Sequence, residues 1–140
     1  MRRLQRDGRI TATALAAEVG LTVAPCHRRL KELESSGVIQ GYRAVVDAAK
    51  VGLAFEAMVF VTLRDRQHML RFEEEVAGIP QVVEAVRLFG EPDFLLRVRA
   101  ADLAAYQRFY DGVLVGLPGV EKLTSTIVMK NVKDGGQLPV

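Results

Sequence analysis

Apolar positions near the start of the chain recur at helical spacing. In residues 11–19 the side chains of Leu15, Ala16 and Val19 fall on one side, and Thr11 stands where an N-cap residue is expected. A glycine then interrupts the pattern. The segment therefore predicts a short helix that packs by one face.

A second helix is predicted over residues 22–36. The Thr22 hydroxyl is placed to cap it, Pro25 lies in the first turn where a missing N–H costs nothing, and Gly37 supplies the stop. The apolar side consists of Cys26, Leu30 and Leu33, with Val23 nearby. Two helices joined by a tight glycine-containing turn predict a helix-turn-helix.

The opposite side of the second helix is small and neutral at its start and cationic further on. It carries Ala24, Arg28 and Lys31, flanked by His27. This profile is typical of a helix whose first part enters a DNA major groove. The alternative is a solvated charged face balanced by Glu32 and Glu34. The predicted DNA-contacting residues are Thr22, Ala24, Pro25, His27, Arg28, Arg29 and Lys31.

The second part of the chain changes to a period of two. Residues 38–46 predict a strand or an extended hinge. After a linker, strands are predicted at 55–63, 81–89, 93–99 and 120–130, and helices at 67–78 and 102–117. The order βαββαβ is the ferredoxin-like arrangement, so the fold class is α+β.

The first strand carries apolar residues on both faces. Phe55, Val59 and Val61 share one face, and Met58 and Phe60 share the other. Because both helices of a ferredoxin-like unit cover the same sheet face, the other face needs a partner. We expect a dimer at least.

Charge is distributed unevenly along the 140 residues, whose net charge is +2. Residues 1–45 carry eight Lys/Arg and four Asp/Glu, a net +4, whereas the other 95 residues carry 11 and 13, a net −2. A basic head on a mildly acidic body favours a polyanionic partner. The expected divisions are a helix-turn-helix domain at 1–45, a linker at 46–53, a ferredoxin-like domain at 54–130 and a tail at 131–140.

Several classes of chemistry are disfavoured. The single cysteine, Cys26, lies on the apolar side of its helix and is expected to be a buried structural thiol. His27 and His68 are the only histidines, and neither metal-ligand spacing nor a phosphate-binding glycine motif occurs. No apolar run approaches the roughly 20 residues of a membrane span. We expect no enzyme activity, cofactor, metal or membrane association, and a cytoplasmic, nucleoid-associated protein.

The turn between the two central strands is a candidate small-molecule site. Backbone N–H groups at Gly90 and Glu91 could hold a carboxylate, and Asp93 could pair with an α-ammonium group. The last strand offers the hydroxyls of Thr124, Ser125 and Thr126. From the residues alone, a plain hairpin with a surface acid is the favoured interpretation.

Motifs in both halves resemble the Lrp/AsnC family of transcription regulators. They are LQRDGRIT at 4–11, LAAEVGL at 15–21, PCHRRLKELESSGVIQGY at 25–42, FGEPDFLL at 89–96, Ala105-Tyr106, LPGV at 117–120 and VMK at 128–130. The resemblance covers nearly the whole chain in order. It implies assembly of dimers into tetramers or octamers. It also implies an amino-acid effector near the 90–93 loop, at a contact between dimers, in a sensing domain called RAM, and so favours an effector site over a plain hairpin.

The chain departs from that family at its start. Family members have a longer first helix, whereas only Met1 to Arg6 precede Asp7 here. Either the first helix is shortened, which would lower the DNA affinity, or the natural start of the protein lies upstream of Met1. An alternative function is therefore an amino-acid sensor or oligomerisation module with impaired DNA binding. A small ferredoxin-like enzyme is a third hypothesis, but it lacks a catalytic constellation.

Overall fold

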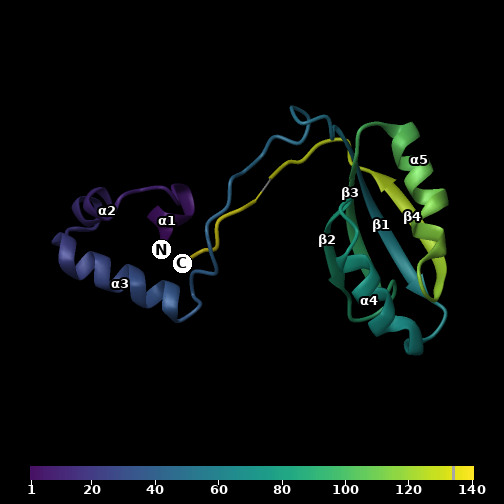
Figure 1. Ribbon diagram of the computed structural model, residues 1–140, viewed down its shortest axis with the longest axis horizontal. Helices are drawn as coiled ribbons and strands as arrows, with labels where there is room; N and C mark the ends of the chain where they lie inside the picture. Colours follow the sequence, from purple (N-terminus) through teal and green to yellow (C-terminus); the bar gives the residue numbers. More distant parts are fainter. Residues whose placement is uncertain (134) are drawn as a thin grey trace. The chain divides into compact units, whose positions relative to one another are not determined.

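The computed structural model describes residues 1–133 and 135–140 and divides into two compact units. The first unit, the head, combines Met1–Val45 with Val132–Val140. The second, the sensor, is Val46–Asn131. Figure 1 shows that the head is helical and that the sensor combines a sheet with helices.

The head contains helices α1 (Arg2–Arg6), α2 (Ala12–Val19) and α3 (Val23–Ser35). The two helices predicted from the sequence are confirmed as α2 and α3. The Thr11 hydroxyl accepts a hydrogen bond from Ala14 N at 3.2 Å, as expected of an N-cap. Gly20 adopts φ +68°, a left-handed conformation that suits glycine and turns the chain sharply between the helices.

One local prediction in the head is wrong, and the structure decides between the two alternatives of another. Thr22 occupies the N-cap position of α3, but its described side chain makes no capping hydrogen bond. Residues 38–46, all of them described, form an extended connection and no strand. The buried core of the head is small and consists of Leu15, Ala16 and Cys26, with Leu4, Ile10 and Leu21 packed against it.

The sensor has the predicted βαββαβ order. Its elements are β1 (Phe55–Leu63), η1 (Arg66–His68), α4 (Met69–Ala77), β2 (Val82–Arg87), β3 (Phe94–Ala100), α5 (Leu103–Gly112), η2 (Leu114–Gly116) and β4 (Val120–Ile127). The strands form one antiparallel sheet in the order β2-β3-β1-β4. The ferredoxin-like prediction is thereby confirmed.

The main core lies between one sheet face and both helices. Alternate residues of β1, among them Val59 and Val61, are fully buried, because successive side chains of a strand point to opposite faces. Phe72 of α4 packs on Phe94 of β3 with ring centroids 4.7 Å apart. Tyr106 of α5 joins the same core.

The helix predicted at 102–117 is shorter than expected. Asp102 caps it by accepting from Ala105 N at 2.7 Å, but α5 ends at Gly112, and a 3-10 turn follows. Glycine disfavours helix continuation, and the break places Leu114 in the core, where it is fully buried. The last strand likewise ends at Ile127 and does not extend to 130.

The residues at the C-terminal end pack on the head, whereas the sequence indicates only a tail there. Leu138 N donates to Gln5 Oε1 at 2.7 Å, and Gln5 Nε2 donates to Leu138 O at 3.2 Å. Arg2 Nε donates to Val140 O at 2.8 Å. These contacts lie within the head and tie it to a segment distant in sequence.

Candidate nucleic-acid interface and effector hairpin

The predicted cationic face of α3 is open to solvent. His27, Arg28 and Lys31 are exposed, and Cys26 on the other side is buried. Arg28 Nε lies 3.8 Å from Glu32 Oε1, and the Arg28 side chain is 74% exposed. An ion pair this exposed and this long contributes little energy. Arg28 can therefore leave Glu32 and bind a DNA phosphate or base edge at small energetic cost.

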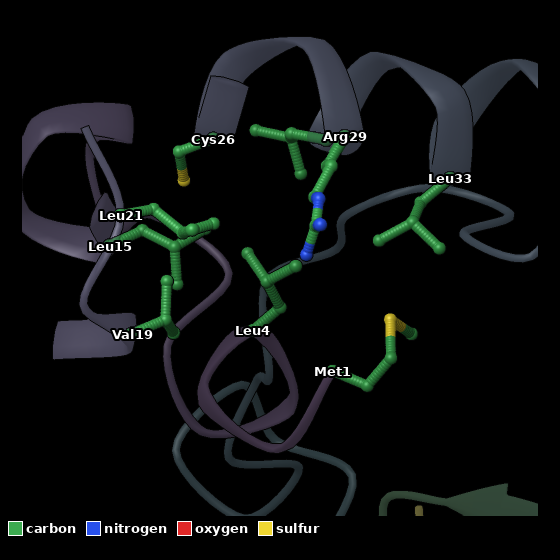
Figure 2. A pocket seen from close by; sticks show the side chains of 9 residues that line it. Met1, Leu4, Leu15, Val19, Leu21, Cys26, Arg29 and Leu33 are labelled. Atoms are coloured by element: carbon green, nitrogen blue, oxygen red, sulfur yellow. The ribbon is translucent and has the colours of Figure 1, made fainter. Parts of the chain in front are cut away.

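Arg29 lies on a different side of the helix from Arg28. It lines an apolar cavity of about 280 Å³ together with Met1, Leu4 and Leu33. Figure 2 shows its guanidinium group extending into the space between these side chains. Arg29 is itself exposed, and the structure places it beside this cavity and on a different side of α3 from Arg28. The sequence contains the signal, since Arg29 follows Cys26 by three residues and thus shares its helical side.

The start of α3 is accessible. Thr22 and Ala24 are exposed and Pro25 is half-buried. Cys26 N donates to Thr22 O at 3.2 Å, which closes the first turn. The small side chain of Ala24 leaves space for close approach, and the first-turn N–H groups point out of the helix end, where anions are favoured.

In the candidate effector hairpin, Asp93 makes hydrogen bonds that stabilise the turn. Its Oδ2 accepts from Leu63 N at 2.7 Å, its backbone N–H donates to Val61 O at 2.9 Å, and its carbonyl accepts from Leu88 N at 2.8 Å. These bonds tie the β2–β3 turn to the end of β1. Gly90 adopts φ +127° within the turn, a conformation that strongly favours glycine.

The three predicted hydroxyls of β4 do not share one surface. Thr124 and Thr126 pair with Phe60 and Met58 on the sheet face away from the helices. Ser125 points to the opposite face, where its hydroxyl is hydrogen-bonded to the Tyr106 hydroxyl. Strand β1 also lies between β4 and β3 in the sheet. The structure therefore does not gather these hydroxyls with the hairpin.

The sensor contains a crevice that the sequence analysis did not predict. It has a volume of about 220 Å³ between α4 and β2. Its lining comprises Phe72, Glu73, Val76, Ala77, Ala85, Arg87 and Phe94. Arg87 Nη1 lies 3.4 Å from Glu73 Oε1. The two charges are 14 residues apart in sequence, so no local pattern marks the crevice.

Within residues 1–133 and 135–140, no group of three or more His, Cys, Asp or Glu side chains is placed to hold a metal ion. Over the same residues, no helix has the length and apolar character needed to cross a membrane. Cys26 is a buried free thiol.

Both parts of the chain match family models. Residues 56–138 match the Lrp/AsnC ligand binding domain, and residues 1–40 match a winged helix-turn-helix DNA-binding domain. The chain is 37% identical to the DNA-binding transcriptional activator DecR of Escherichia coli, over 98% of this chain and 91% of the relative. It is 38% identical to the Bkd operon transcriptional regulator of Pseudomonas aeruginosa, over 94% and 88%.

Solved structures show the same similarity along the whole chain. A transcriptional regulator of Neisseria meningitidis in complex with L-methionine superposes with a TM-score of 0.93 at 33% identity, covering 98% of this chain and 90% of the other. An AsnC family transcriptional regulator from Agrobacterium tumefaciens gives a TM-score of 0.91 at 34% identity, covering 99% and 91%.

Proposed function

The chain belongs to the Lrp/AsnC family of transcription regulators, and we propose that it binds double-stranded DNA through the exposed face of α3 under the control of a small amino acid. The observation that carries the DNA half is the polarity of α3, because Cys26 is buried while Arg28 and Lys31 face solvent. The role is regulatory rather than enzymatic, and the proposed place of action is nucleoid DNA in the cytoplasm.

The proposed DNA contacts divide by chemistry. Arg28 suits a guanine edge, which accepts two parallel hydrogen bonds, and Lys31 suits a phosphate. Thr22, Ala24 and Pro25 form the part that approaches the duplex first, and His27 flanks it. Arg29, the remaining member of the predicted set, is assigned a supporting role beside α1.

A titration of DNA from upstream of the chain's own gene tests this proposal. At low ionic strength we expect salt-sensitive binding that Arg28→Ala weakens about tenfold, since a bidentate contact is worth about 1–3 kcal/mol. The matched control is Arg108→Ala, which removes an exposed arginine from α5 in the sensor. Equal weakening by both substitutions, or an absence of binding, contradicts the proposal.

Self-association is proposed through the sheet face that the helices leave open. Met58 and Phe60 lie there half-buried, beside Leu95 of β3, and a second copy would remove their remaining surface from water. A dimer places two α3 helices for the half-sites of a palindrome, about one DNA turn apart. Assembly into tetramers or octamers would raise avidity through effective concentration. A monomeric mass by light scattering contradicts this part.

The proposed effector is a small amino acid held at the hairpin. Backbone N–H groups at Gly90 and Glu91 are assigned to its carboxylate and Asp93 Oδ1 to its ammonium group, since Oδ2 is bonded to Leu63 N. Thr124, Ser125 and Thr126 are not assigned to this ligand, because Ser125 faces Tyr106 and β1 separates β4 from β3. A relative in crystals with L-methionine supports the ligand class.

Calorimetry of the full chain with each of the twenty amino acids tests the effector. We expect heat from at least one of them, with L-methionine measured first, and weaker heat after Glu91→Pro, which removes a backbone N–H from the turn. A uniform absence of heat contradicts the proposal. Amino-acid binding without DNA binding would favour the alternative, a sensor whose head no longer binds DNA.

A further inference from the structure

A cavity of about 460 Å³ in the head is lined by basic side chains that do not belong to α3. Its lining comes from α1, from the turn after α1 and from the connection that follows α3. The described lining includes Arg6, Arg9 and Arg43 and no acidic residue. All three arginines are exposed. This cavity, here called the arginine hollow, therefore presents three cations to solvent in one place.

Two segments that are distant in sequence meet at the arginine hollow. A Cβ added at Gly8 would lie 3.0 Å from Tyr42 Cδ1, so the backbone of the turn passes directly against the aromatic ring. The Tyr42 hydroxyl donates to Glu34 Oε1 at 3.0 Å, which fixes the ring beside the end of α3. The residues that follow the glycine and the tyrosine, Arg9 and Arg43, are thereby brought to the same cavity.

The four acidic residues of positions 1–45 do not neutralise the arginine hollow. Glu18 and Glu32 form ion pairs with arginines outside it. Asp7 Oδ1 accepts a hydrogen bond from Arg9 N at 2.8 Å, a bond to the backbone that shapes the turn. Glu34 is the acceptor of the tyrosine hydroxyl. Within the described head, the guanidinium groups of the hollow therefore have no carboxylate partner and are available to an anion from outside.

We propose that the arginine hollow binds phosphates of the same DNA duplex that α3 contacts. This inference rests on the proposed DNA-binding function and adds a second contact surface to it. A guanidinium group binds a phosphate through two parallel hydrogen bonds. Such contacts fix the orientation of a protein on DNA without reading the base sequence. The duplex is thus held by the segments that precede and follow the helix-turn-helix as well as by α3 itself.

The salt dependence of DNA binding by the full chain tests the arginine hollow. In a double variant, Arg9→Gln and Arg43→Gln, we expect the slope of log K against log salt to become shallower by about 2, since each phosphate contact contributes about −0.9. The matched control, Arg64→Gln and Arg66→Gln, removes two exposed charges from the sensor and has the same net charge. Thermal melting verifies that both variants are folded. A hollow variant whose slope equals that of the wild type, or that of the control, overturns the proposal.

The absence of sequence readout gives a second test. The hollow variant should lose affinity by the same factor for DNA from upstream of the gene and for a shuffled duplex of equal length. Arg28→Ala should lower the ratio of the two affinities, because Arg28 is proposed to contact a base edge. A ratio that falls as far in the hollow variant as in Arg28→Ala overturns the assignment to phosphates. If the wild type binds DNA and the hollow variant binds equally well, only the hollow is refuted, whereas a wild type that binds neither duplex refutes the proposed function as well.

Discussion

Replacing Glu56 by glutamine should be among the most destabilising single-charge changes in the sensor. The substitution keeps the shape of the side chain but leaves Arg97 and Arg99 without their shared carboxylate, at contacts of 2.8 and 2.6 Å. Removal of one member of a buried ion pair typically costs about 3–5 kcal/mol. The two arginine side chains retain 29% and 19% exposure, so we expect the lower end, about 3 kcal/mol.

The matched control is Glu84→Gln. Glu84 contacts the same Arg97 at 3.1 Å, but its side chain is 56% exposed, so its loss should cost about 0.5 kcal/mol. The assay is urea unfolding at neutral pH and a fixed protomer concentration, because self-association would contribute to the apparent stability. Added salt should reduce the effect of Glu84→Gln more than that of Glu56→Gln. Equal costs for the two variants would refute the assignment of Glu56 as a desolvated ion pair.

Two further predictions concern the sensor core and its turns. Gly119 has φ +69°, and in Gly119→Ala the new Cβ would overlap His68 Cβ, so we expect the free energy of unfolding to fall by about 3 kcal/mol or more in thermal melting. The control is Gly20→Ala, where φ is +68° but the space is open, and its free energy of unfolding should fall by only about 1–2 kcal/mol. Equal losses in the two variants would rule out the steric contact with His68. Burial raises the pKa of Tyr106 and outweighs the opposing hydrogen bond from Ser125, so its neutral form stabilises the fold fully below about pH 10 and less as the pH rises through the raised pKa. Tyr106→Phe should lower the free energy of unfolding by about 1 kcal/mol at neutral pH, and it should reduce the fall of that free energy as the pH rises above about 10. An unchanged dependence of stability on alkaline pH would contradict the assignment to Tyr106.

Local patterns predicted the elements well because their causes are local. The period of two in β1 separates Val59 and Val61 from Met58 and Phe60, and the structure confirms both faces. The polarity of α3 likewise follows from the helical period. The end of α5 was misplaced because Gly112 interrupts an apolar stripe that continues at helical spacing to Leu117.

Features that depend on distant partners were not predictable in the same way. Glu56 meets Arg97 across 41 positions and Asn131 across 75, and no pattern in β1 alone indicates that this acid is buried. The contact between Gln5 and Leu138 spans 133 positions. The hydrogen bond that Asp93 accepts from Leu63 N was equally unpredictable from the local sequence, because it depends on β1 lying beside the hairpin.

The dependence of DNA affinity on salt tests the central claim about α3 most directly. The measurement compares the wild type with a double variant, Arg28→Gln and Lys31→Gln, which keeps the helix and removes two exposed charges. Each phosphate contact contributes about −0.9 to the slope of log K against log salt, so the loss of the Lys31 contact should make the slope shallower by about 1, and the loss of the Arg28 contact with a base edge should lower the affinity. Affinity should also fall at every salt concentration. Identical affinities and slopes for the two proteins would show that DNA is bound elsewhere or not at all.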